Sequence, residues 1–161
     1  DVPRGLTAAE TVALIHAQGG IAVAAHPYAV MLPLLGMDGM QGVKSLIRHV
    51  PFDGVEVRNA TPTEFFSNPV TAWKRRGTQT AATGGSDTHY LPTVGSTFTW
   101  FAGENSTDLR RAIETRQTRA GGYVYSPFLI FSVLKDMMSR HLPVRDLNRT
   151  RRSQWPLWSE T

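Results

Sequence analysis

The sequence predicts an α/β fold with a mainly parallel β-sheet. Helical and strand patterns alternate along the chain, which is typical of βαβ units in an open sheet or a closed barrel. Polar residues follow three consecutive predicted strands: His26 after the first, Arg58 and Asn59 after the second, and Asp87 and His89 after the third. Because the carboxyl ends of parallel strands meet at one edge of a sheet, these side chains are expected to lie together.

The first helix and strand have the clearest signals. Thr7 and Glu10 have the spacing of a capping box, which predicts a helix ending near Gln18, where two glycines provide a stop. Residues 21–25 form a short run of small and apolar side chains, bounded by glycine and by a His-Pro pair. Such a run predicts a strand that is buried on both faces, as in a parallel sheet.

The remaining elements continue the alternation. Asn68, followed by proline, is expected to cap a helix that stops at Gly77. Ser106 is expected to cap another helix, whose inward face carries apolar residues and whose outer face carries arginines. The further helices are predicted at residues 40–49 and 126–140, and the further strands at residues 55–57, 79–83 and 95–101.

The composition is that of one soluble, globular domain with a basic end. Of 161 residues, 41% are hydrophobic and 19% are charged. Residues 140–161 hold five arginines against two acidic residues, so they carry +3 of the net charge of +4. We therefore expect a domain over residues 1–142 and a basic, tryptophan-containing tail over residues 143–161. The tail fits a solvated or packed edge better than a site for an acidic partner or nucleic acid.

The absence of cysteine excludes disulfides, zinc fingers and thiol catalysis. The longest apolar stretch, residues 127–134, is too short to span a membrane, and no signal peptide is visible. We expect a cytoplasmic protein, although the lack of cysteine constrains the compartment only weakly. The chain begins with Asp1 rather than methionine, so its true amino terminus can lie further upstream.

Asp87 and His89 are a natural pair of metal ligands. In an extended segment, residues two apart point the same way, so both can face one site. A carboxylate with an imidazole suits zinc, manganese or iron, and the two glycines at residues 84–85 allow a tight turn. His26 is a third candidate. Its structural alternative is a strand-end histidine bonded to neighbouring backbone, and the three other histidines are expected to be ordinary surface or half-buried residues.

Several segments together resemble one known family. Ala25-His26-Pro27, residues 54–59, residues 85–89, Val94-Gly95 and residues 109–113 occur in the order and spacing of the PHP (polymerase and histidinol phosphatase) family. The resemblance covers roughly residues 7–119. It implies an irregular, TIM-like (β/α) barrel with mainly parallel strands and up to three divalent metal ions (zinc, manganese or iron), which hydrolyses phosphate esters with a metal-activated water.

The resemblance also implies roles for single residues. His26, Asp87 and His89 match metal ligands of the family. Glu56 and Asn59 match an E-x-x-N feature beside the site, without being assigned as direct ligands. Arg58 could contact a phosphate, because guanidinium binds phosphate in a bidentate manner, or it could form a plain surface salt bridge.

The chain also departs from the family pattern. The H-x-H motif of the family's first strand is absent, so the chain resembles only the carboxy-terminal part of the domain. The other half is expected to be missing from a fragment, to lie on another chain or to have been lost. The resemblance implies that the three matched ligands go largely to different metals, each completed by residues of the missing half. Because a metal site normally needs three or four protein ligands, these 161 residues alone are expected to be weak or inactive. We also expect the missing half, or a partner chain, to cover the sheet edge at residues 21–25.

Three functions fit these observations. The first is hydrolysis of a phosphate ester, with a phosphorylated small molecule or a nucleotide as substrate. The second is a non-catalytic PHP remnant that acts as an interaction or structural module in a larger assembly. The third is another barrel metallohydrolase, such as an amidohydrolase, which the Gly-Gly-Ser-Asp-Thr-His string at residues 84–89 disfavours.

Overall fold

The computed structural model describes residues 1–29, 42–88, 91–126, 128 and 135. It divides the chain into two units, Asp1–Tyr125 and Ser126–Thr161. The predicted last helix and the basic tail belong to the second unit and lie almost entirely outside the described residues. The fold described below is that of the first unit. No helix in the described part of the chain is both long enough and apolar enough to cross a membrane.

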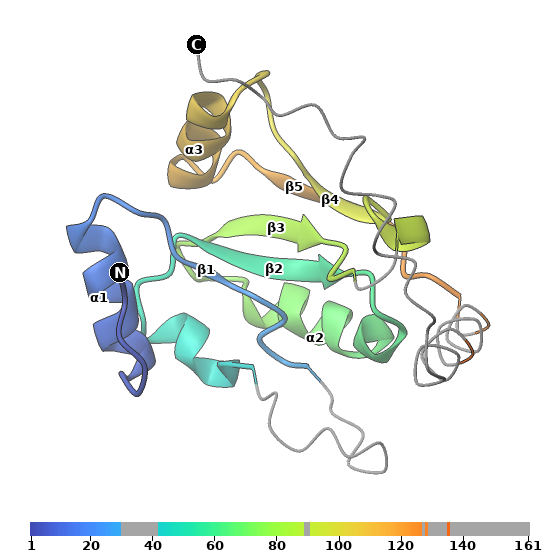
Figure 1. The fold of residues 1–161 in the computed structure, drawn as a ribbon, viewed down its shortest axis with the longest axis horizontal. Helices are drawn as coiled ribbons and strands as arrows, with labels where there is room; N and C mark the ends of the chain where they lie inside the picture. Colours follow the sequence, from blue (N-terminus) through green and yellow to red (C-terminus); the bar gives the residue numbers. More distant parts are fainter. Residues whose placement is uncertain (30–41, 89–90, 127, 129–134, 136–161) are drawn as a thin grey trace, which may run out of the picture. The chain divides into compact units, whose positions relative to one another are not determined.

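Three parallel strands form the sheet that positions the site (Figure 1). They are β1 (Val23–Ala24), β2 (Gly54–Asn59) and β3 (Ala81–Gly85), in the order β1-β2-β3. The register pairs Val23 with Gly54, and Gly54 with Ala81. The predicted mixed α/β class and the parallel pairing are thus confirmed. A barrel is not shown, because these strands form an open three-stranded sheet within the described residues, which is compatible with a fragment of one.

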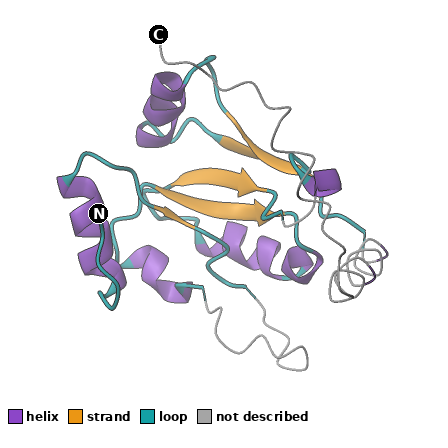
Figure 2. Ribbon diagram, viewed as in Figure 1, coloured by secondary structure: helices purple, strands orange, loops and turns teal. Residues whose placement is uncertain are grey.

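A second, antiparallel sheet lies next to β3 (Figure 2). It consists of β4 (Thr97–Trp100) and β5 (Arg119–Gly122), which are joined through helix α3 (Ser106–Glu114). The Thr118 hydroxyl donates to the carbonyl oxygen of Ala82 at 2.7 Å and so ties this sheet to β3. The sequence analysis missed β5, because its residues Arg-Ala-Gly-Gly have neither the alternation nor the β-branched side chains of a strand.

The first helix forms as predicted. In α1 (Ala8–Ala17), the Thr7 side chain accepts from the Glu10 amide while the Glu10 carboxylate accepts from the Thr7 amide, so both halves of the capping box are present. Gly19 ends the helix with a left-handed φ of 73°. The buried Val12 of α1 packs in one cluster with Ala22, just before β1, and with Val50 and Phe52, which precede β2.

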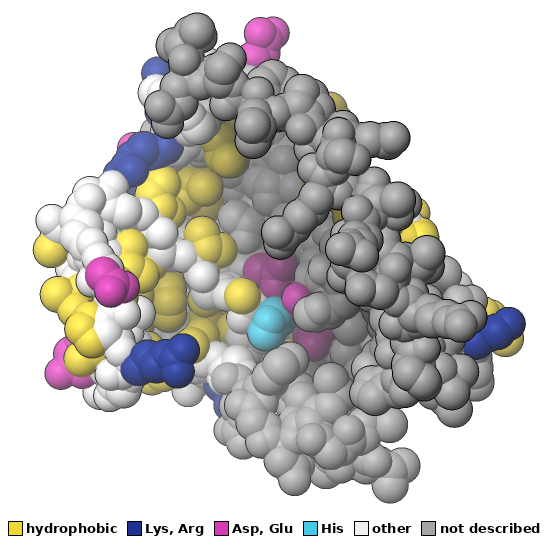
Figure 3. All heavy atoms as spheres, viewed as in Figure 1, with side chains coloured by type: hydrophobic (Ala, Val, Ile, Leu, Met, Phe, Trp, Pro, Cys, Tyr) yellow, Lys and Arg dark blue, Asp and Glu magenta, His cyan; other side chains and the backbone are white. Residues whose placement is uncertain are grey.

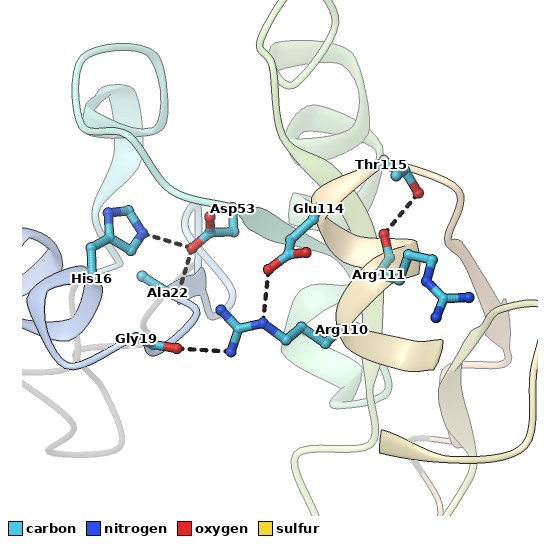
Figure 4. A network of polar contacts seen from close by, with 8 residues as sticks. All are labelled: His16, Gly19, Ala22, Asp53, Arg110, Arg111, Glu114 and Thr115. Atoms are coloured by element: carbon cyan, nitrogen blue, oxygen red, sulfur yellow. Dashed lines mark hydrogen bonds and ion pairs between the residues drawn. The ribbon is translucent and has the colours of Figure 1, made fainter. Parts of the chain in front are cut away.

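Polar contacts connect α1 and α3 to the segments before β1 and β2 (Figure 4). One carboxylate oxygen of Asp53 accepts from the Ala22 amide at 2.7 Å and lies 2.8 Å from Nε2 of His16. On the other side, the Arg110 guanidinium of α3 donates to the Gly19 carbonyl oxygen at 2.8 Å. Segments distant in sequence are therefore fixed around the turn between α1 and β1.

The predicted α-helix at residues 40–49 is wrong. Its described part is a short 3-10 helix, η2 (Lys44–Arg48). Lys44 has a left-handed φ of 49°, and its amide donates to the Pro27 carbonyl oxygen at 2.8 Å, so an α-helix cannot run through this position. Ile47 is nevertheless buried against Ala24 and Val55, as the apolar pattern requires.

Two predicted helix caps are also wrong. Helix α2 (Ser67–Lys74) follows the 3-10 helix η3 (Pro62–Phe65) and begins one residue before Asn68. The Asn68 side chain bonds to the backbone of Asn59 instead of capping its own helix. In α3, the cap is Asn105 rather than Ser106, and its side chain accepts from the Asp108 amide.

Strand β1 is shorter and less buried than predicted. It has two residues, and burial alternates along it: Ala22 and Ala24 are buried, whereas Val23 is 41% exposed. The reason is its position at the edge of the three-stranded sheet, where one face of the strand packs against the described core and the other does not.

Candidate functional site

The carboxyl ends of the three parallel strands bring four of the predicted site residues together. The His26 amide donates to Oε2 of Glu56 at 2.7 Å. The Asn59 side-chain amide donates to the same Glu56 oxygen and to Oδ2 of Asp87, both at 3.2 Å. Figure 3 shows a histidine beside acidic side chains on one face of the molecule. His89 lies outside the described residues, so its predicted place in the site stays a prediction.

A β-bulge explains how Glu56 and Asn59 reach the same site. Residues three apart in a regular strand point to opposite faces of the sheet. The register of β2 against β3 shifts between Glu56 and Arg58, so one extra residue is inserted there. The shift turns the end of the strand, and Asn59, fully buried, can then bond to Glu56. Two residues with the E-x-x-N spacing can therefore meet on one strand because the strand has this bulge between them.

His26 and Asp87 both have a left-handed backbone. Their φ angles are 25° and 44°, in a region that side chains other than glycine seldom adopt. Such conformations cost on the order of 1–3 kcal/mol each and are concentrated at functional sites. Each lies two residues after the end of a strand, His26 after β1 and Asp87 after β3, where the chain turns out of the sheet.

The ring of His26 has a buried polar atom with no partner. Its Nδ1 atom is inaccessible to solvent and makes no hydrogen bond to any residue that the structure describes. The structural alternative, a histidine whose ring bonds to neighbouring backbone, does not hold for Nδ1 among the described residues. The bond to Glu56 comes from the His26 backbone amide and not from the ring. An unsatisfied buried nitrogen costs about 1–3 kcal/mol, which a bound proton donor or metal ion would remove.

The donor set fits a divalent metal only in part. Imidazole and carboxylate groups are ligands for zinc, manganese and iron, and His26 and Asp87 provide one of each. Across the part of the chain that the structure describes, however, no three His, Asp or Glu side chains are close enough to hold an ion. Further ligands, with His89 the predicted one, would be needed for a complete site.

Glu64 is a site neighbour that the sequence analysis missed. It lies on η3, is only 5% exposed and accepts a hydrogen bond from the Ser67 hydroxyl. Burial raises the pKa of its carboxyl group, the Ser67 hydroxyl and the charge of His26 lower it, and the charges of Glu56 and Asp87 raise it. No sequence signal marked this residue, because one glutamate between threonine and two phenylalanines looks like a solvated loop residue.

Within the described part of the chain, Arg58 forms no salt bridge. Its guanidinium donates to the carbonyl oxygen of Gly122 and so ties the end of β2 to β5. The residue is exposed, and its predicted contact with phosphate stays a prediction.

Titration of Glu56 should make the stability of the protein depend on pH. Burial raises the pKa of the Glu56 carboxyl, although hydrogen bonds from Asn59 and His26 lower it. A raised folded pKa means that the folded state binds more protons, so stability falls as pH rises from the unfolded pKa of about 4.3 through the raised value. The difference in the free energy of unfolding between Glu56→Gln and wild type should therefore favour the variant more at about pH 8 than at about pH 4. Urea denaturation of both proteins at the two pH values would measure it.

Glu10 provides a control, because the pKa of its carboxyl group is lowered rather than raised. Hydrogen bonds from the Thr7 side chain and backbone lower its pKa, so the stability it contributes is lost as pH falls. Glu10→Gln should lose stability relative to wild type at the higher pH and not at the lower one. The same sign for both variants would contradict the assignment for Glu56.

Comparison with known proteins supports the family assignment. Residues 75–118 match the family model described as PHP-associated. The predicted resemblance to the carboxy-terminal part of a PHP domain is confirmed. The matched residues include β3, Asp87, β4 and α3, whereas His26, Glu56 and Asn59 precede them.

One curated protein is similar over a short stretch. An uncharacterized protein of Methanocaldococcus jannaschii is 42% identical over 60 residues, which cover 37% of this chain and 30% of that protein. The aligned part of the chain therefore spans less than a third of its relative's length. No solved structure matches the chain significantly.

Proposed function

We propose that the chain is part of a metal-dependent phosphoesterase of the PHP type, which hydrolyses phosphate esters of small molecules or nucleotides. One observation carries this proposal. His26 and Asp87 follow β1 and β3 on left-handed backbones, and Glu56 and Asn59 of the intervening β2 connect them by hydrogen bonds. The PHP-associated match over residues 75–118 supports the choice of this chemistry over that of other barrel metallohydrolases.

Under this proposal, the site residues have two kinds of role. His26, Asp87 and His89 would be ligands of divalent ions (zinc, manganese or iron), and residues of the missing half would complete their coordination. Glu56 and Asn59 would fix their positions, since Glu56 holds the His26 backbone and Asn59 holds the Asp87 carboxylate. Divalent ions in such sites lower the pKa of bound water and neutralise charge on phosphate oxygens.

The metal content of the protein tests this proposal. Elemental analysis of the complete natural protein, as wild type and as a His26→Ala/Asp87→Ala/His89→Ala variant, should find stoichiometric zinc, manganese or iron in the first and none in the second. Wild type should then hydrolyse a panel of phosphomonoesters and phosphodiesters, and the variant should not. The absence of metal from both proteins would contradict the proposal and favour the non-catalytic interaction module.

The exposed edge of the sheet supports a missing partner. Val23 of β1 is 41% exposed at the edge of a parallel sheet, a kind of sheet that is usually covered on both faces. We propose that the rest of a PHP domain, or a partner chain, covers this edge. Nothing in the described residues favours nucleic acid as that partner.

A further inference from the structure

In the segment of residues 61–68, which contains Glu64, the charged side chain is buried and the aromatic side chains are exposed. Glu64 is 5% exposed, while the next two residues, Phe65 and Phe66, are 62% and 75% exposed. Transfer from water favours the burial of phenylalanine and opposes the burial of a carboxylate. Hydrophobic packing therefore cannot be the reason that the glutamate points inward at this position.

Site residues hold the segment at both of its ends. At its beginning, the Thr61 amide donates to the Asn59 side chain at 2.8 Å, and the Thr61 hydroxyl donates to Asp87 at 3.4 Å. At its end, the Asn68 side chain makes two hydrogen bonds to the backbone of Asn59, at 2.8 and 2.9 Å. The segment thus starts and ends at the carboxyl end of β2, and Glu64 lies in its middle.

The surroundings of the Glu64 carboxylate are short of positive charge. Its hydrogen-bond donor is the neutral Ser67 hydroxyl, and within the described ranges no lysine, arginine or histidine forms an ion pair with it. It lies within electrostatic range of His26, and also of Glu56 and Asp87, whose negative charges oppose its own. The charge of Glu64 is thus opposed by two other carboxylates, and the Nδ1 atom of His26 is buried without a partner among the described residues, so a cation near these groups would be stabilised.

We propose that Glu64 is a positioning residue of this site, whose negative charge strengthens the binding of a divalent cation by His26 and Asp87. This inference rests on the proposed function. Glu64 acts through its charge rather than as a ligand, because its carboxylate is held within its own segment by the Ser67 hydroxyl. A buried charge has a large effect on a nearby ion, since the low-dielectric surroundings screen it weakly.

The test compares Mn²⁺ binding by isothermal titration calorimetry in three forms of the complete natural protein: wild type, Glu64→Gln and Glu114→Gln. Glutamine keeps the size of the side chain and can still accept from Ser67, so the local fold is retained. Loss of the charge should weaken Mn²⁺ binding about tenfold. Glu114, which is exposed on α3 and paired with Arg110, provides a control with the same chemical change and no expected effect.

The outcomes separate this inference from the proposed function. If wild type binds no Mn²⁺, the proposed function itself fails. If wild type binds Mn²⁺ and Glu64→Gln binds it equally well, the role of Glu64 fails while the proposed function stands. Should Glu64→Gln not fold, Glu64→Asp, which keeps the charge, should retain wild-type affinity, and a tenfold loss there would overturn a role based on charge.

Discussion

Asn59→Leu should destabilise the protein by about 3 kcal/mol, because it leaves several buried polar groups without partners. Asn59 is fully buried, and its side chain donates to Glu56 and Asp87 and accepts from the Thr61 amide. Leucine fills a similar volume but offers no hydrogen bond. Urea denaturation would measure the loss, which should be accompanied by weaker binding of divalent metal, because the Asp87 carboxylate is no longer held.

Asn105→Leu is the matched control for this change. Asn105 is exposed and makes one hydrogen bond as the cap of α3, so its replacement should cost about 1 kcal/mol. It lies far along the chain from the site residues and should leave metal binding unchanged. Equal losses of stability in the two variants would show that Asn59 is not the buried centre of the hydrogen-bond network described above.

Gly122→Ala should destabilise the protein by about 3 kcal/mol, because crowding and backbone strain add at this position. Gly122 has a φ of 100°, and a Cβ atom there would overlap the Ser96 carbonyl oxygen and lie 2.6 Å from the Cα of Thr97. The nearest obstacles are backbone atoms, so no side-chain rotation relieves the clash. The pairing of β4 with β5 should weaken at this end, and with it the bond from Arg58 to the Gly122 carbonyl.

Gly77→Ala separates these two causes. Gly77 also has a positive φ, of 83°, but an added Cβ would meet no atom within 4 Å. Its replacement should therefore cost only the left-handed backbone strain, about 1–2 kcal/mol. Thermal and urea denaturation of both variants would check the difference. A loss at Gly77 as large as that at Gly122 would mean that crowding against Ser96 has no measurable effect.

Local signals in the sequence predicted the parts of the fold that depend on nearest neighbours. The capping box at Thr7 and Glu10, and the left-handed stop at Gly19, use backbone groups within one or two turns, so the residue types alone indicate them. The order of helices and strands also predicted that His26, Asn59 and Asp87 would come together, since parallel strands end at one edge.

The remaining features depend on contacts between distant segments. Asparagine is a favoured helix cap, but the side chain of Asn68 bonds to the backbone of the distant Asn59 instead. The bulge in β2 arises from its pairing with β3, which no local pattern in β2 encodes. Glu64 points inward because its segment is held at both ends, so its burial could not be predicted from its neighbours in sequence.

The left-handed backbones of His26 and Asp87 also bear on the history of the chain. At both places glycine would relieve strain, so selection for stability alone favours the loss of these two side chains. A gene copy released from the demands of chemistry would be expected to drift toward glycine at these two codons before it lost its core. Under the proposed function, we therefore expect working copies in related genes to keep His and Asp at residues 26 and 87.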